Sequence, residues 1–206
     1  YDASVTFPAA CGKLVKFAAD RGLVLDRKAA AKIFSSMCAS RLILLSSKTL
    51  SFIPKLLEVL GEFFGSGCYM DRYTSFRSAE DMLLRSSESG YRAKSQIARA
   101  IAGAETKRNT VHMAVLDAVS PEDIVRFFMP FARYVNYPDG GSVVTLRESD
   151  HSENAYTVSP NVWFVFVLKE GADLSAVDAY IANMAAYLDL AVSVTEEAAG
   201  KAGEDA

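Results

Sequence analysis

Three polar residues stand where two short apolar runs end. Lys48 and Thr49 follow the run over residues 41–46, and Asp117 follows the run over residues 111–116. Runs of this length and composition predict buried strands of a parallel sheet, and open α/β sheets bind ligands at the carboxyl ends of their strands. A lysine, a hydroxyl and a carboxylate could there hold phosphate groups and magnesium, so the three residues predict a residual nucleotide site. The alternative is structural, with Lys48 and Thr49 at a helix entry and Asp117 in a turn.

The chain has few other candidates for chemistry. It has three cysteines, Cys11, Cys38 and Cys68, without a C-x-x-C pair, and two histidines, His112 and His151, far apart in sequence. A zinc site or a cysteine–histidine pair has too few residues here, so we expect no metal site and no cysteine nucleophile. The odd number of cysteines favours buried, reduced thiols in a cytoplasmic protein. His112 is expected to be a core or edge residue of its strand.

Length and charge limit the class of function. The 206 residues, half of them hydrophobic, suit one α/β domain with a sizeable core. The chain begins with Tyr1 rather than Met, so we expect an excised segment or a processed chain. No apolar stretch reaches the roughly 18 residues needed to span a bilayer, so no membrane association is expected. The net charge of −3 and the scattered Lys and Arg residues argue against a nucleic-acid partner.

The elements that position these residues follow from hydrophobic periodicity and turn residues. Helices are predicted for residues 11–21, 27–39, 52–64, 76–85, 91–105, 120–136 and 174–188, and strands for residues 41–46, 66–74, 111–116, 161–168 and 190–194. The turn sequence PDGG predicts a β-hairpin insertion near residues 138–158. The alternation predicts a three-layer αβα sandwich with a mostly parallel sheet of about five strands. We expect a single domain over residues 1–195, with a helical lead-in over residues 1–40 and a disordered tail over residues 196–206.

Three sequence blocks in a fixed order resemble the AAA+ ATPase module, and within it the branch of the GTPase subunit of McrBC-type restriction systems. They are LDAVS at residues 116–120, YVNYPDG at residues 134–140 and NVWFV at residues 161–165. The family has L-D-E-M-N, L-E-Y-P-D-G and N-V-W-F-V-G-T-x-N at these places. The resemblance covers most of the chain and implies a P-loop NTPase fold. Lys48 and Thr49 then match the Walker A lysine and hydroxyl, and Asp117 matches the Walker B acid.

The departures from the family pattern fall on residues that contact the γ-phosphate. A Walker A loop needs glycines because consecutive backbone N–H groups must turn toward the phosphates, and only two serines separate Leu45 from Lys48. The water-orienting glutamate of the family aligns with Ala118, its sensor asparagine aligns with Lys169, and its arginine finger falls near Met184. Lys169 could bind an anion, place its ammonium where the γ-phosphate would lie, or be an ordinary solvated lysine. The combined losses predict that hydrolysis has been abandoned.

The sequence therefore predicts a catalytically inactive AAA+-like scaffold or protein-interaction module, with a protein partner or self-association and without a cofactor. An alternative is a divergent nucleotide-binding protein or slow NTPase that uses Lys48, Thr49 and Asp117 with ATP or GTP and magnesium. A second alternative is a nucleic-acid-handling component of a defence or mobile-element system, which the net charge argues against. Fold alone does not supply function, so the choice depends on the site.

Overall fold

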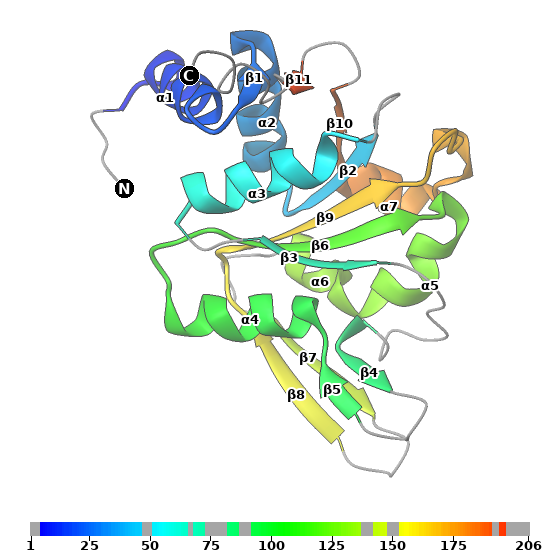
Figure 1. The fold of residues 1–206 in the computed structure, drawn as a ribbon. Helices are drawn as coiled ribbons and strands as arrows, with labels where there is room; N and C mark the ends of the chain where they lie inside the picture. Colours follow the sequence, from blue (N-terminus) through cyan, green and yellow to red (C-terminus); the bar gives the residue numbers. More distant parts are fainter. Residues whose placement is uncertain are drawn as a thin grey trace, which may run out of the picture.

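The computed structural model describes residues 5–46, 51–65, 68–72, 82–86, 92–136, 142–147, 153–190 and 194–196. Its centre is a five-stranded sheet in which every strand runs parallel to its neighbours, in the order β10-β2-β9-β6-β3 (Figure 1). The strands are β2 (Leu42–Ser46), β3 (Cys68–Arg72), β6 (His112–Val119), β9 (Val162–Leu168) and β10 (Ala186–Asp189). Helices cover both faces, which confirms the predicted α/β fold with three layers.

The sheet is apolar on both faces because it is buried between helices. Leu42 and Leu44 of β2 pack into the core on one face. Ile43 and Leu45 pack into the core on the other face. Alternate side chains of a strand point to opposite faces, so a strand buried on both sides reads as an unbroken apolar run. This is why a run such as residues 161–168 predicts a central strand.

Three helices cover the face that is uppermost in Figure 1: α1 (Phe7–Ala19), α2 (Arg27–Ala39) and α3 (Ile53–Phe63). The Asp26 carboxylate caps α2 by accepting a hydrogen bond from the Ala29 backbone N–H at 2.6 Å. Pro54 lies in the first turn of α3, where no intrahelical N–H bond is lost. All three helices are predicted from the sequence, and a short strand between α1 and α2, β1 (Leu23–Leu25), is an addition to the predicted elements.

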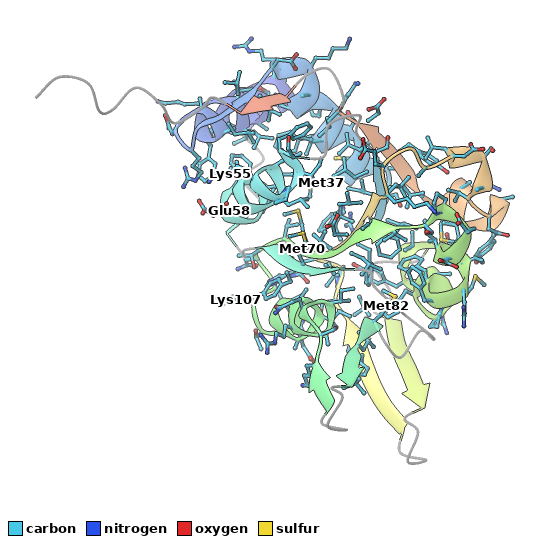
Figure 2. The ribbon with its side chains drawn as sticks, turned by 45° about the vertical axis from the view of Figure 1, so that its right-hand side comes forward. Met37, Lys55, Glu58, Met70, Met82 and Lys107 are labelled. Carbon is cyan, nitrogen blue, oxygen red and sulfur yellow. The ribbon has the colours of Figure 1, made fainter. Side chains whose placement is uncertain are left out.

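A small apolar cavity of about 20 Å³ lies between α2, α3 and the sheet. Met37 of α2, which is labelled in Figure 2, lines it together with Met113 of β6 and Trp163 of β9. The side chains around it present apolar surface, and a void of this size holds little more than a water molecule. It is a packing defect of the core, and we assign it no ligand.

Four helices pack on the opposite face: α4 (Gln96–Thr106), α5 (Ile124–Phe128), α6 (Ala132–Asn136) and α7 (Ala179–Met184). Ser95 begins α4, since its Oγ accepts from the Ala98 N–H at 3.0 Å and donates to the Met82 carbonyl. The predicted helix over residues 120–136 is divided. Pro130 lacks the N–H that a continuous helix needs, and a 3₁₀ turn, Met129–Phe131, separates α5 from α6.

Two antiparallel hairpins extend below this layer in Figure 1: β4 (Leu84–Ser86) with β5 (Arg92–Lys94), and β7 (Ser142–Arg147) with β8 (Glu153–Val158). The second pair confirms the predicted hairpin insertion. The PDGG sequence before β7 and the connection between β7 and β8 lie outside the described residues. The helix predicted over residues 91–105 is confirmed as α4 from Gln96 onward, but β5 replaces its first turn. The helix predicted over residues 76–85 is wrong at its described end, where β4 begins. Pairing between strands here overrides weak local helix propensity.

The C-terminal region differs most from its prediction. In place of one helix over residues 174–188, the chain forms a 3₁₀ turn (Leu174–Ala176), then α7, then β10. Pairing of β10 with β2 buries Leu188, and this outweighs the helical pattern of the segment. The final strand lies later than the predicted one over residues 190–194: β11 (Val194–Glu196) pairs antiparallel with β1. Its last residue therefore belongs to the fold rather than to a disordered tail.

The side chains of two of the three cysteines are described. Cys11 is buried in α1 as expected, but Cys38 is exposed. It follows the buried Met37 by one residue, so it turns away from the face of α2 that packs on the sheet. Among the described helices, none combines the length and the apolar character that crossing a membrane requires.

Candidate functional site

The connections from neighbouring strands change faces at the carboxyl edge of the sheet. After β2 the chain passes to α3 on one face, whereas after β9 and after β6 it passes to helices on the other face (Figure 1). β2 and β9 are adjacent, with Leu45 opposite Val167. In open α/β sheets such a reversal marks the place where ligands bind. The carboxyl ends of β2, β9 and β6 therefore define the candidate site.

Asp117 lies at this edge, near the end of β6, and its side chain is half-buried. Met113 and Val115 face the α3 side of the sheet and Leu116 faces the other side, so alternation places Asp117 on the α3 side. Within the described part of the chain, no residue forms a hydrogen bond or an ion pair with its carboxylate. A carboxylate at this edge could contact a cation or a polar group of a ligand.

The end of β6 departs from a regular strand. Between the pairs Leu116–Phe166 and Val119–Leu168, β6 has two residues where β9 has one, which defines a β-bulge. Ala118 lies in this bulge with a φ of 60°, in the left-handed region. That conformation costs a residue with a Cβ about 1–2 kcal/mol. The Ala118 methyl group is half-buried, at the position where the sequence resemblance predicts the loss of a water-orienting glutamate.

Lys169 follows β9 and contacts the segment that follows β6. Its backbone N–H donates to the Val119 carbonyl at 3.0 Å, its ammonium donates to Ser120 Oγ at 3.0 Å, and Glu122 Oε1 is 3.4 Å from the ammonium. The pKa of the Glu122 carboxyl is lowered, first by a hydrogen bond from its own backbone N–H and also by the Lys169 ammonium. Both side chains are exposed, so the ion pair contributes little to stability. The contacts instead fix the direction of the Lys169 side chain, whose ammonium points at Ser120 and Glu122.

Lys48 and Thr49, the other predicted phosphate ligands, lie outside the described residues. The elements on either side are described: β2 ends at Ser46 at the carboxyl edge, and α3 begins at Ile53. Sheet topology therefore brings the segment that contains Lys48 and Thr49 to the same edge as Asp117. Phosphate binding by this pair stays a prediction.

Met184, the position expected for an arginine finger, ends α7 near the opposite, amino edge of the sheet. Its carbonyl accepts a hydrogen bond from Ser40 Oγ at 2.6 Å, and Ser40 Oγ in turn accepts from the Leu42 N–H at the start of β2 at 2.9 Å. All of α7 is described, and it contains no arginine or lysine. This helix therefore supplies no cation to the candidate site.

Ser120 and Glu122 belong to the site although the sequence alone does not point to them. Their segment, SPED, reads as the capped first turn of a helix. In the structure it forms the link and the 3₁₀ turn (Pro121–Asp123) between β6 and α5. The signal that could have found them is the predicted end of the neighbouring strand. Lys169 follows that strand, at the same edge of the sheet as the segment after β6. It is therefore placed to contact Ser120 and Glu122.

The described residues of the candidate site could contact the magnesium ion of a magnesium–nucleotide complex, but they offer no free cation for its phosphates. Asp117 offers the carboxylate oxygen that magnesium prefers, on the side of the sheet that α3 covers. Lys169 is engaged with Ser120 and Glu122 rather than open to a phosphate. No group of three or more His, Cys, Asp or Glu side chains among the described residues could hold a metal ion. A magnesium ion at Asp117 would therefore take most of its ligands from phosphate and water.

Comparison with known proteins does not place the chain in a family. No protein-family model matches the sequence, and no curated protein matches it. The fold and the edge residues define a class, which is an α/β protein with an all-parallel five-stranded sheet and polar residues at its topological switch point.

Proposed function

We propose that this chain is a catalytically inactive AAA+-like domain that serves as a scaffold or protein-interaction module. The arrangement of three strands supports the proposal. β2, β9 and β6 are neighbours in the sheet, and they bring Ser46, Lys169 and Asp117 to one edge. The segments that match the family at its nucleotide site therefore converge. In this proposal the frame for a nucleotide is retained and the chemistry that would split it is lost.

Ala118 is the observation that carries the proposal. Hydrolysis needs a carboxylate that orients the attacking water, and general-base catalysis of this kind contributes roughly 10²–10⁴-fold in rate. A methyl group offers no proton acceptor. The bulge makes this position unsuitable for a carboxylate as well. Ala118 has a left-handed backbone with a φ of 60°, a conformation that residues with longer side chains rarely adopt. The engagement of Lys169 by Ser120 and Glu122 points in the same direction.

The test measures nucleotide binding and turnover together. A nucleotide present at 100 times its Kd would stabilise the fold by about 2.7 kcal/mol, which corresponds to a rise of about 5–10 °C in Tm for a chain of this length. We expect no saturable shift of this size with millimolar Mg-ATP or Mg-GTP, and no phosphate release above the rate without protein. Turnover that disappears in Asp117→Asn and persists in the control variant Glu170→Gln would refute the proposal.

A second function, nucleotide binding with slow or no hydrolysis, is favoured by one observation. The Asp117 carboxylate is half-buried and has no partner among the residues that the structure describes. On this alternative, Mg-ATP or Mg-GTP raises Tm, and the effect depends on magnesium and is lost in Asp117→Asn. Glu170→Gln removes one negative charge beside Lys169, and it should keep the shift because Glu170 is exposed. Equal loss in both variants would indicate an effect of net charge rather than a site.

The scaffold part of the proposal predicts association with a protein surface. Two large apolar side chains on the elements after β9 are exposed, Leu174 at 41% and Tyr180 at 48%. Sedimentation at increasing concentration should therefore show self-association that weakens in the double variant Leu174→Ser/Tyr180→Ser. A chain that stays monomeric at all concentrations would contradict self-association.

A further inference from the structure

A second cluster of polar groups lies at the amino edge of the sheet, where α4 ends and β6 and β9 begin. Asn161 Nδ2 donates to the carbonyls of Ala104, Lys107 and Thr110, at 3.3, 3.0 and 2.8 Å. The last carbonyls of a helix have no intrahelical partner, so this amide satisfies the end of α4 and ties it to β9. Figure 2 labels Lys107 at this end of the helix.

His112 makes a second tie to the same end of α4. Its side chain is 1% exposed, and its backbone N–H donates to the Asn161 carbonyl at 2.8 Å. Its ring Nε2 lies 2.9 Å from Thr110 Oγ1, whose own hydrogen goes to the Lys107 carbonyl at 3.0 Å. The hydroxyl can therefore only accept from the ring. This assigns the ring proton to Nε2 and leaves Nδ1 without one.

The Nδ1 atom of this neutral ring is buried, and it has no hydrogen-bond partner among the described residues. It is packed against α4, since a Cβ added to Gly103 would lie 3.2 Å from Nδ1. On another side the Tyr69 ring of β3 stacks on the imidazole, with the ring centroids 6.2 Å apart. A proton on Nδ1 would create a donor without an acceptor and a charge in a place that excludes water.

We propose that His112 is an acid-sensitive latch that holds the C-terminal end of α4 on the sheet. The titratable groups that face the ring among the described residues are Tyr69 of β3 and Lys107 after α4. Asn161, just before β9, is uncharged. No described carboxylate pairs with the ring, so an imidazolium would meet the Lys107 ammonium without a compensating anion. Protonation therefore favours states in which this end of α4 has moved away and the ring reaches water.

Release of the C-terminal end of α4 would affect the elements packed around this helix. α4 lies between the sheet and the two hairpins in Figure 1, and its buried face packs into the same core as the strands above it. Release of its C-terminal end would therefore loosen the layer that carries β4-β5 and β7-β8, while the α1, α2 and α3 layer on the other face keeps its own core.

The direction of the pH response follows from the burial of the ring. Burial lowers the pKa of His112 from 6.5, its ordinary value, and is the largest effect. A hydrogen bond to the Lys107 carbonyl opposes this shift in part, and the Lys107 charge adds a smaller lowering. The folded state then binds the proton less readily than the unfolded state does. The stabilisation is complete above pH 6.5 and is lost progressively as the pH falls through 6.5 toward the lowered pKa.

Hydrogen exchange on the intact chain tests the proposal. After correction for intrinsic exchange, the amides of residues 103–107 should open more readily as the pH falls from about 7.5 to about 5.5, approaching a tenfold increase per pH unit between the two pKa values. His112→Gln keeps a donor for Thr110 Oγ1 and cannot titrate, so its opening should not follow the pH in this way. His151→Gln removes the only other imidazole of the chain and should respond like the unmodified protein.

An NMR titration of the His112 ring decides the matter if His112→Gln does not fold. A ring pKa below 6.5, with Nε2 protonated at neutral pH, supports the latch. A ring pKa at or above 6.5 would overturn it. That result would follow if a protonated Nδ1 bonded to Asn161 Oδ1, which is also buried and without a partner among the described residues. A pH response that survives in His112→Gln would overturn the proposal as well.

Discussion

Replacing Ala118 with glycine is expected to stabilise the protein. Ala118 holds a φ of 60°, where the Cβ of an L-residue approaches the following carbonyl oxygen at a cost of about 1–2 kcal/mol. Glycine avoids this cost, but it loses about 0.5–1 kcal/mol more conformational free energy on folding than alanine does. The difference leaves a net gain of about 0.5–1 kcal/mol in the free energy of unfolding.

Thermal denaturation measures this gain directly. For a chain of this length 1 kcal/mol corresponds to about 2–4 °C, so Ala118→Gly should raise Tm by about 1–4 °C. Ala114→Gly is the matched control, because Ala114 lies in the same strand, is fully buried and is not left-handed. It should lower the free energy of unfolding by about 1–2 kcal/mol, through backbone entropy and the loss of a buried methyl group.

The two variants should therefore shift Tm in opposite directions. If Ala118→Gly lowers Tm as Ala114→Gly does, the backbone at Ala118 is not strained and the reasoning about the bulge is wrong. The outcome bears on function too, since a strained residue next to the edge carboxylate would mark a place where local geometry is held by the surrounding fold.

Three further changes test the site and its supports. Tyr134→Phe removes a buried hydroxyl placed 3.0 Å from the Ser159 carbonyl and 2.5 Å from that of Val162, and it should destabilise the fold by about 1–3 kcal/mol in chemical denaturation. Val165→Ile adds a methylene beside the 20 Å³ cavity and should stabilise by about 0.5 kcal/mol, seen as a higher denaturant midpoint with an unchanged slope. Ala118→Glu should melt below the unmodified protein and release no phosphate from Mg-ATP, because the restored carboxylate would sit on a left-handed residue.

The central sheet could be predicted from the sequence because burial on both faces makes a strand apolar throughout. The run over residues 41–46 and the run over residues 161–168 carry this signal, and both form strands that lie next to each other. The position of the site could be predicted on the same basis. Asp117 and Lys169 are polar residues at the ends of such runs, and parallel strands bring their carboxyl ends to one edge.

The details of the site could not be predicted, because they depend on which strands are neighbours. Alanine carries no local signal for a left-handed backbone, so the bulge at Ala118 is visible only in the pairing of β6 with β9. The contact of Lys169 with Ser120 joins residues far apart in sequence and follows from the same pairing. Segment 174–188 reads as a helix by its periodicity, and only the pairing of β10 with β2 makes its end a strand.

The pairing of β1 with β11 has a consequence for how the molecule is made. Leu25 lies opposite Val194, so β1 is translated long before its partner. At 5–20 residues per second, roughly 170 residues of intervening chain take about 10–30 s to synthesise. During that interval the edge of β1 that later pairs with β11 is open to neighbouring nascent chains. Ribosome-bound intermediates that lack β11 should therefore bind chaperones through β1 more readily than the folded domain does.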